Sequence, residues 1–299
     1  MPAPTPLPSV LAPGFTVDDA RDAGVSASRL RRKDLVPPFH GARSRGALSD
    51  AQRLGLLLAV VPLHACAAGA TAALLHGLPL PPAREADAFG RPVLAVPVGA
   101  TRVRRPGVRG CVLDLVGDDV VRRRGVRTLS VARTWVDLSR QLGLADLVAV
   151  TDRILSRRAP LLTRDDLMAM AERFARTPYA RLRAEALRLA DAGSESPQES
   201  WTRVTLVTAG LPAPECNVEI WDGDRMIGRV DMLYPAQKLI IEYQGDHHRD
   251  PAQWRADELR RAELEAAGYR VTYVTAADRR DPARLVARIR RLLAAPTRP

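Results

Sequence analysis

The sequence has few cysteines and no pattern that would join them. Cys66, Cys111 and Cys216 are the only three in 299 residues, and no two form a CxxC pair. An odd number of widely spaced cysteines argues against a disulfide framework and against a structural zinc site. We therefore interpret each cysteine as a small buried hydrophobe, which suits a reducing cytoplasm.

Aromatic residues and long hydrophobic runs are also scarce. Aromatics make up 4% of the chain, whereas apolar residues make up 46%, so the cores should be aliphatic. The most apolar run, residues 55–70, is interrupted by Pro62 and His64 and is too short to span a bilayer. The N-terminus lacks the basic start and apolar segment of a signal peptide. These absences predict a soluble cytoplasmic protein with no membrane partner.

Acidic residues are outnumbered by basic ones. The chain carries 45 Lys and Arg against 34 Asp and Glu, which gives a formal charge of +11. Arginines near phosphates add affinity by releasing counterions, so the composition favours a nucleic-acid partner. The arginine-rich stretch 102–127 fits either a phosphate-binding track or a solvated surface, and both interpretations stay open.

Shifts in composition divide the chain into five segments and predict an α/β (α+β) fold class. The segments are a Pro-rich disordered tail (1–13), a helix-turn-helix-like DNA-binding segment (14–47), an α+β middle domain (48–160), a helical connector (161–192) and a C-terminal domain (193–293). The polar run SESPQES marks the start of the last segment.

The second segment has the pattern of two short helices around a glycine. Thr16 can cap a first helix that ends at Gly24. A second helix would then carry Arg31, Arg32 and Lys33, as the basic recognition helix of a helix-turn-helix does. The alternative is an ordinary solvated basic helix. We name these three residues as candidate DNA contacts.

The C-terminal segment has a regular order of elements. A helix is expected over 197–209, strands over 217–222, 225–233 and 238–244, a long helix over 251–268, a strand over 269–275 and a helix over 281–295. The resulting α-β-β-β-α-β-α order predicts a mixed sheet flanked by helices.

Two acidic residues interrupt the apolar strands of this segment. Asp231 and Glu242 are 11 residues apart, which suits neighbouring strands joined by a short turn. Unpaired carboxylates in apolar strands are costly, so a metal or a charge partner is expected. Carboxylate oxygens are the ligands that Mg²⁺ prefers, and Mg²⁺ or Mn²⁺ is the expected cofactor. The alternative is two acids that face solvent from a half-exposed sheet.

Polar residues follow the third strand and continue on the next helix. His247 and His248 come directly after Gly245, where either could act as an acid or base or orient a phosphate. Arg260 and Arg261 lie on one face of the helix that follows, and they could contact phosphate. A solvated ladder of charges on that helix is an equally good interpretation.

Several motifs in order resemble a known family. The segments SPQES-WTRVTLVTAGLP, GRVDMLYP, IIEYQGDHH and GYRVTYVT are similar to the Vsr-like (very-short-patch-repair endonuclease-like) domains of the PD-(D/E)XK restriction-endonuclease-like superfamily. The resemblance implies a Mg²⁺-dependent DNA endonuclease fold. Asp231 would be its strand acid, Glu242 the acid of the E-x-K element and Glu199 its helix acid. His248 stands where the family often has a histidine.

Two positions leave alternatives open. Glu199 lies four residues before Arg203, so it forms either an ordinary helical ion pair or part of the site. Gln244 stands where the superfamily usually has lysine; it can orient a water but carries no positive charge. The chain is thus either an active endonuclease or a DNA-binding regulator with a catalytically silent nuclease fold. An RNA-directed nuclease is a third interpretation.

The first 160 residues resemble the winged-helix and following domain of AbiEi-type antitoxin proteins. This resemblance implies DNA binding and transcriptional repression, and it introduces a toxin as a candidate partner. The sequence leaves a homodimer open as well.

Overall fold

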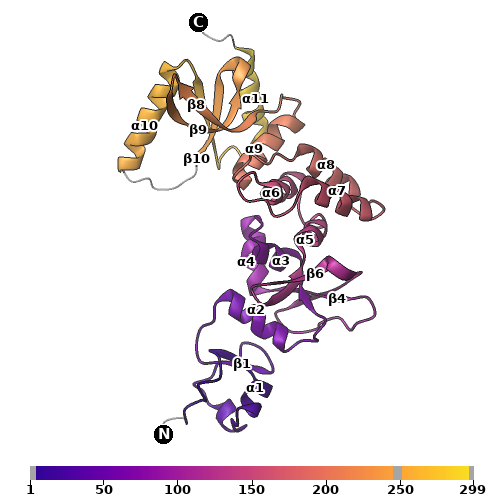
Figure 1. The fold of residues 1–299 in the computed structure, drawn as a ribbon. Coiled ribbons are helices and arrows are strands. Elements are labelled where there is room, and N and C mark those ends of the chain that lie inside the picture. Colours follow the sequence, from indigo (N-terminus) through magenta and orange to yellow (C-terminus); the bar gives the residue numbers. More distant parts are fainter. Residues whose placement is uncertain (1–4, 245–250, 296–299) are drawn as a thin grey trace. The chain divides into compact units, whose positions relative to one another are not determined.

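The computed structural model describes residues 5–244 and 251–295, apart from the side chains at positions 89 and 251–254. The chain divides into two compact units, residues 1–138 and residues 139–299. Figure 1 shows the elements of both units, which are described separately below.

The N-terminal unit begins with a small two-stranded sheet. Strands β1 (Gly14–Thr16) and β2 (Ala42–Ser44) pair antiparallel, and helix α1 (Val17–Asp22) follows β1 directly. The Thr16 hydroxyl accepts a hydrogen bond from the Asp19 N–H at 3.0 Å, and the Asp19 carboxylate accepts one from the Thr16 N–H at 2.9 Å. This reciprocal capping box starts the helix where the sequence predicts it.

The predicted second basic helix of this segment does not form. A single 3-10 turn, Arg29–Arg31, stands in its place, because Arg32 already has extended backbone geometry and Ser28 makes no side-chain cap. Arg31, Arg32 and Lys33 therefore lie on a turn and not on a recognition helix. A guanidinium–carboxylate pair between Arg29 and Asp34, at 2.7 Å, holds this turn closed.

The expected disordered tail is also corrected where residues 5–13 are described. Leu11 is 7% exposed and packs with Phe15, Leu30 and Leu35 in a small apolar cluster. Arg45 donates to the carbonyl oxygens of Pro8 and Leu11, at 3.0 and 3.1 Å. The Pro-rich segment is thus packed against the fold because its leucines supply part of the core.

A five-stranded mixed sheet forms the centre of the N-terminal unit. Its order is β5-β4-β3-β7-β6, with strands β3 (Cys66–Ala67), β4 (Val93–Pro97), β5 (Arg109–Leu113), β6 (Val120–Arg123) and β7 (Val126–Leu129). The helices around it are α2 (Asp50–Ala59), α3 (Gly69–His76), α4 (Pro82–Gly90) and α5 (Val131–Leu138). The sequence predicts β4 and most of β5 but not the hairpin β6–β7.

Apolar clusters cover the two faces of this sheet. Leu54 and Leu57 of α2 pack with Leu94 and Val96 of β4. A second cluster, which joins Ala72 of α3 to alternate strand residues, includes Cys66. Burial raises the pKa of the Cys66 thiol to about 12, so this cysteine is a core residue and not a nucleophile.

The C-terminal unit begins with four helices. They are α6 (Leu144–Leu155), α7 (Arg164–Arg173), α8 (Ala180–Leu189) and α9 (Pro197–Thr208). Helix α6 packs against both α8 and α9. The division into units therefore falls at 138/139 and not at the predicted residue 160, because α6 packs against α8 and α9.

A buried ion pair joins α6 to α9. The guanidinium of Arg203 lies 2.6 Å from the carboxylate of Asp152, and their side chains are 5% and 1% exposed. The Ser200 hydroxyl and the Asp191 N–H also donate to this carboxylate, at 2.7 and 2.8 Å. Burial raises the pKa of Asp152 to about 6, while Arg203 acts in the opposite direction.

A four-stranded mixed sheet completes the unit. Its order is β11-β10-β9-β8, with strands β8 (Glu215–Asp222), β9 (Arg225–Tyr234), β10 (Leu239–Gln244) and β11 (Arg270–Thr275), and helices α10 (Pro251–Ala266) and α11 (Pro282–Ala294). Strands β10 and β11 are parallel, whereas the other pairs are antiparallel.

Helices cover both faces of this sheet, as Figure 1 shows. Leu206 of α9 and Leu285 of α11 pack with Met232 and Ile241 on one face. Leu264 of α10 packs on the other face with Ile240 and its neighbours. The mixed α+β fold class predicted from the sequence is confirmed. Among the described residues no helix is long and apolar enough to cross a membrane.

We expect Arg203→Met to destabilise the C-terminal unit by about 3–5 kcal/mol, because Asp152 would remain buried without its counter-charge. The matched control is Arg188→Met on α8. Arg188 pairs with Glu185 at 2.7 Å, but the two side chains are 61% and 39% exposed, so the control should cost at most about 1 kcal/mol. Urea unfolding followed by circular dichroism measures both; equal losses would contradict the assignment.

Candidate active site

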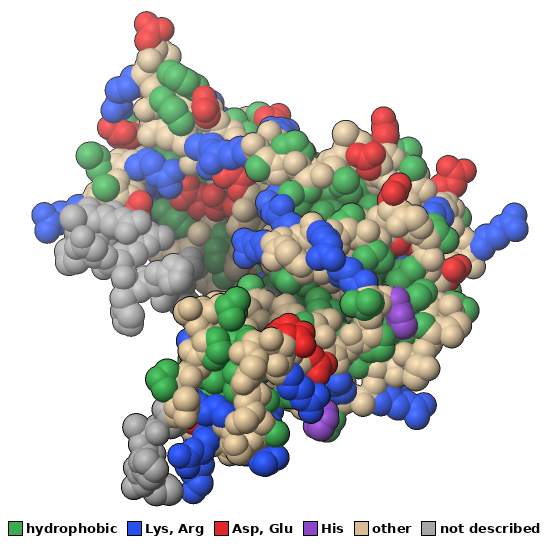
Figure 2. Space-filling model, turned by 60° about the horizontal axis from the view of Figure 1, so that its bottom comes forward, with side chains coloured by type: hydrophobic (Ala, Val, Ile, Leu, Met, Phe, Trp, Pro, Cys, Tyr) green, Lys and Arg blue, Asp and Glu red, His purple; other side chains and the backbone are tan. Residues whose placement is uncertain are grey.

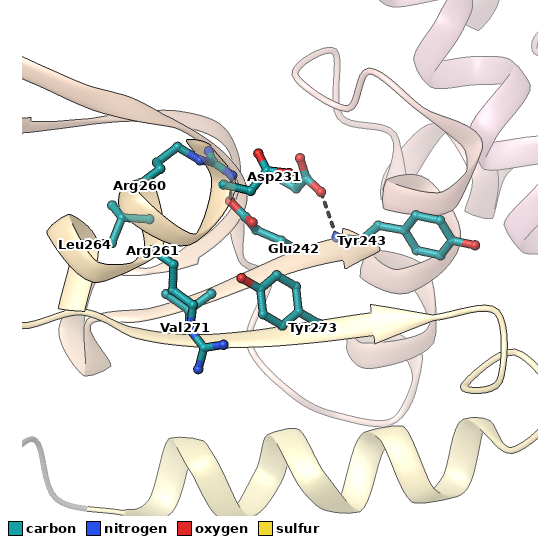
Figure 3. A pocket seen from close by; sticks show the side chains of 9 residues that line it. Asp231, Glu242, Tyr243, Arg260, Arg261, Leu264, Val271 and Tyr273 are labelled. Atoms are coloured by element: carbon teal, nitrogen blue, oxygen red, sulfur yellow. Dashed lines mark hydrogen bonds and ion pairs between the residues drawn. The ribbon is translucent and has the colours of Figure 1, made fainter. Parts of the chain in front are cut away.

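Strand register brings the two predicted carboxylates together. Strands β9 and β10 pair up to Ile241 opposite Met232, and one residue further Glu242 stands opposite Asp231. Side chains at opposite positions of an antiparallel pair lie on the same face, with Cβ atoms about 4.5–5.5 Å apart. Figure 3 shows the two carboxylates beside each other, as the 11-residue spacing predicts.

Beyond Ile241, a contact with a side chain replaces the backbone pairing of β9 and β10. The N–H of Tyr243 donates to the Asp231 carboxylate at 2.8 Å. The Tyr243 ring points away from the two acids, as Figure 3 shows, and packs at the edge of the opposite core. Backbone of β10 therefore fixes one oxygen of Asp231. The other oxygen accepts no hydrogen bond from the described parts of the chain.

An arginine from α10 neutralises Glu242. Arg260 donates to Glu242 at 2.8 Å with one guanidinium nitrogen, and to the carbonyl oxygen of Arg229 at 2.9 Å with the other. A Cβ at Gly228 would lie 3.0 Å from the Arg260 Cδ, so glycine leaves room for the arginine to cross β9. This ion pair supplies the charge partner that the sequence requires for Glu242.

A pocket of about 120 Å³ surrounds the carboxylate pair. Its lining is Asp231, Glu242, Tyr243, Asp257, Arg260, Arg261, Leu264, Val271 and Tyr273. A water molecule occupies about 30 Å³ in the liquid, so the space suits a few waters or one hydrated cation. Arg261 lies over the Tyr273 ring at 5.7 Å and contacts Glu265 at 2.9 Å, which keeps a second guanidinium at the rim.

Burial sets the protonation behaviour of both acids. It raises the pKa of Asp231, against the effect of the Tyr243 hydrogen bond and of Arg260. It also raises the pKa of Glu242, where Arg260 opposes the rise and the charge of Asp231 adds to it. Because burial disfavours the charged form of both carboxylates, a cation between them would stabilise that form.

Glu199 is held close to this pair. Its carboxylate accepts hydrogen bonds from the Asn217 side chain at 2.7 Å and from the Glu195 N–H at 2.9 Å. Burial raises the pKa of Glu199, and the nearby charge of Asp231 adds to the rise. The predicted alternative of a Glu199–Arg203 helical ion pair is wrong, because Arg203 binds Asp152.

Sequence reasoning missed Asn217. Its φ of +53° lies in the left-handed region, and its partner position is skipped in the β8–β9 register. Asparagine tolerates this conformation better than most residues. The irregularity turns the amide toward Glu199 and also toward the carbonyl of Gly193, at 2.7 Å. The signal in the sequence is a lone asparagine in an otherwise regular strand.

The structure places one further predicted residue of this unit, Gln244, outside the pocket lining. Gln244 ends β10 opposite Thr275 and is exposed. His247 and His248 lie outside the described residues. Arg31, Arg32 and Lys33 belong to the other unit.

The donor set suits a hard cation that is only partly held by protein. No group of three or more His, Cys, Asp or Glu side chains with metal-binding geometry occurs in the described part of the chain. Mg²⁺ is commonly bound by one or two carboxylates and completes its shell with water and substrate oxygens. Asp231 and Glu242, each with one carboxylate oxygen outside the hydrogen bonds given above, fit that requirement.

The arginines of the stretch 102–127 lie in two separate parts of the N-terminal unit. One is a shallow hollow of about 430 Å³ lined by Arg91, Arg102, Arg104, Arg105 and Arg109. Two of these are engaged, since Arg105 donates to the His40 carbonyl at 2.9 Å and Arg109 pairs with Asp87 at 3.2 Å. The other is the β6–β7 hairpin. Figure 2 shows Lys and Arg side chains over much of the face drawn, with acidic ones among them.

Comparisons with known proteins give a relationship over nearly the whole chain. No protein-family model matches it. The chain is 32% identical over 268 residues to the uncharacterized proteins Rv2248 and MT2308 of two Mycobacterium tuberculosis strains, H37Rv and CDC 1551, covering 89% of this chain and 94% of each relative. The crystal structure of the RV2827C protein from Mycobacterium tuberculosis aligns with a TM-score of 0.40 and 17% identity, over 70% of this chain and 84% of that one.

We expect Asp231→Asn to raise the free energy of unfolding near neutral pH by about 0.5–2 kcal/mol. This is a typical gain when a substitution removes an unfavourable group from a functional site. The carboxylate pKa is raised in the folded state, so folding penalises the charged form. The penalty is absent below pH 3.8, the ordinary pKa, grows between that pH and the higher folded pKa, and stays at its full value above it. The gain should therefore disappear in acid. Asp224→Asn, in the exposed β8–β9 turn, is the control; a less stable Asp231→Asn protein at neutral pH would contradict this.

Proposed function

The chain belongs to the family of the uncharacterized mycobacterial protein Rv2248, and from its carboxylate pair we propose that it is a metal-dependent DNA endonuclease. The observation that carries the proposal is the position of Asp231 and Glu242, side by side where β9 and β10 stop pairing, in a pocket rimmed by two arginines. The α-β-β-β-α-β-α order around this pair supports the resemblance to Vsr-like domains, with Mg²⁺ or Mn²⁺ as cofactor. Such an enzyme would act on DNA in the cytoplasm.

The residues divide the work of phosphodiester hydrolysis. Asp231 and Glu242 would hold the divalent cation, which when bound lowers the pKa of a coordinated water and offsets charge on the phosphate. The Tyr243 N–H keeps Asp231 in one orientation. The Asn217 side chain, which donates a hydrogen bond to Glu199, likewise keeps that carboxylate in one orientation.

The arginines supply fixed positive charge near the scissile phosphate. Arg260 is anchored at the Arg229 carbonyl as well as at Glu242, so its guanidinium stays in the pocket. Arg261 lies one residue further along the rim. A preorganised cation stabilises the charge that builds on a phosphate during attack by water. This contribution offsets the neutral side chain at Gln244.

We expect the purified protein with Mg²⁺ or Mn²⁺ to convert supercoiled plasmid to nicked and linear forms. Asp231→Ala and Glu242→Ala should each lower the rate by about 100-fold or more, because each removes a metal ligand. Asp224→Ala, an acid-to-alanine change at an exposed turn of the same unit, should cleave like wild type. The readout is the nicking rate on agarose gels over a series of metal concentrations.

Two results together would refute the nuclease. One is that every DNA form stays uncut with both metals. The other is that Asp231→Ala leaves Mn²⁺ binding, measured by electron paramagnetic resonance, unchanged.

A specific observation favours a second candidate, a DNA-binding regulator or antitoxin-like protein whose nuclease fold is catalytically silent. Arg260 already neutralises Glu242 at 2.8 Å, so the pocket is compensated without a metal. Gln244 carries no charge at the end of β10. In this interpretation the net charge of +11 serves binding alone.

For the silent form we expect duplex DNA binding that persists in EDTA and is unchanged by Glu242→Ala, since no metal takes part. Affinity should fall steeply with salt between about 50 and 200 mM, as phosphate contacts require. Fluorescence anisotropy with a labelled duplex measures both properties. Metal-stimulated binding that Glu242→Ala abolishes would favour the enzyme instead.

A further inference from the structure

The β6–β7 hairpin presents an unbroken run of exposed residues. Val121 to Gly125 are all exposed, whereas Val126 and Thr128 on the returning strand are buried in the core. Strand β6 is the last in the sheet order, so among the described residues no strand pairs with its outer side. The register pairs Arg122 with Arg127 and Arg123 with Val126, and the turn lies at residues 124 and 125. The hairpin lies at the label β6 in Figure 1.

The arginine side chains of this hairpin make few interactions with the rest of the described protein. Arg122 donates to the Gly125 carbonyl at 3.2 Å, and Arg127 points inward to the Ala65 carbonyl at 2.5 Å. The side chains of Arg123 and Arg124 form no hydrogen bond or ion pair with the residues that the structure describes. The sequence has no acidic residue from 120 to 136. The arginines at the tip are therefore available to an outside anion.

The turn itself is a second, independent sign. Arg124 has a φ of +50° and Gly125 a φ of +77°. Two-residue hairpin turns with both φ values positive strongly prefer Asn-Gly, because most side chains are strained there. Arginine thus stands at a position where asparagine or glycine would suit the backbone better. A charged residue at a position where its backbone conformation disfavours it points to a role in binding.

We propose that the β6–β7 hairpin is a duplex-DNA-binding ribbon whose tip arginines, Arg122, Arg123 and Arg124, contact phosphates. The B-DNA major groove, about 12 Å wide, admits a two-stranded ribbon. The major groove of an RNA duplex is too deep and narrow for side chains to read. The proposal rests on the proposed function only in taking DNA as the ligand.

This surface replaces the predicted recognition helix. Arg31 ends a 3-10 turn, Arg32 has extended backbone geometry and Lys33 follows it, and Arg29 of the same turn is already paired with Asp34. They cannot enter a groove on one helix face as a helix-turn-helix requires. Arg122 and Arg123, in contrast, stand on β6, whose hydrogen bonds to β7 fix their positions, and Arg124 begins the turn between the two strands.

The first test measures DNA binding by the full chain in EDTA, so that neither metal nor cleavage enters. The triple variant R122Q/R123Q/R124Q should bind a labelled duplex at least roughly tenfold more weakly. Its slope of log affinity against log salt should be shallower by about 0.9 for each phosphate that the variant no longer binds. The matched control is R31Q/R32Q/K33Q, which removes the same charge from the same unit and should change affinity less than about threefold.

Two outcomes would overturn the proposal. One is hairpin-variant affinity within about twofold of wild type, and the other is an equal loss of affinity in the R31Q/R32Q/K33Q control. A wild-type preference for duplex RNA over duplex DNA of the same sequence would overturn the choice of ligand. Because these measurements use EDTA, a failed nicking assay leaves them valid, and a failed binding assay leaves the carboxylate site untouched.

The second test uses the turn. Arg124→Asn should leave the melting temperature unchanged or raise it, because asparagine suits a positive φ, while DNA affinity falls about two- to fivefold and the salt slope becomes shallower by about 0.9. Stability and binding thus move in different directions, which a merely misfolded hairpin cannot produce. A higher melting temperature with unchanged affinity would show that the arginine is not kept for DNA.

Discussion

Negative charge buried in an apolar core must be matched by hydrogen-bond donors, and the C-terminal unit is organised around that constraint. Its buried acids accept hydrogen bonds from guanidinium groups and backbone N–H groups and, at Glu199, from the Asn217 amide. Asp152 is held by Arg203, and that pair joins α6 to α9. Glu242 is held by Arg260, and that pair joins β10 to α10. Both contacts connect helices to the frame that carries the site.

The order of elements in the C-terminal unit could be predicted because each has a strong local signal. Apolar runs mark β9 and β10, Asp222-Gly223 marks the turn before β9, and Gly268 follows the end of α10. The elements of the N-terminal segment are harder to predict, because its sequence signals are weak and favour a helix that the packing of the segment does not form. Leu30 and Leu35 must both enter a small core, which a continuous helix would not allow, so a 3-10 turn forms. The β6–β7 hairpin has arginines where a turn is usually marked by asparagine.

The residues of the site also differ in how far the sequence predicts their positions. The pair Asp231 and Glu242 follows from spacing, because a tight turn between antiparallel strands sets the register. Glu199 could be named as a candidate, but its orientation depends on Asn217, whose left-handed backbone is set by a β8 irregularity. The contact of Arg260 with Glu242 crosses from a helix to a strand 18 residues earlier. No local pattern gives the angle of α10 on the sheet, so that pairing needs the three-dimensional structure.

The position of positive charge in the pocket links the two candidate functions. Where a lysine two residues after Glu242 would bring its charge along β10, this chain has Gln244 and brings the charge from α10 with Arg260. That guanidinium is bound at two points, Glu242 and the Arg229 carbonyl, and Gly228 keeps its path open. In the proposed enzyme, Asp231 and Glu242 would hold the divalent cation, and Arg260 contacts only Glu242 of the two acids. Its second contact, with the Arg229 carbonyl, would keep the guanidinium in the pocket near the phosphate. The residue that compensates Glu242 in this structure would then supply the positive charge that Gln244 lacks.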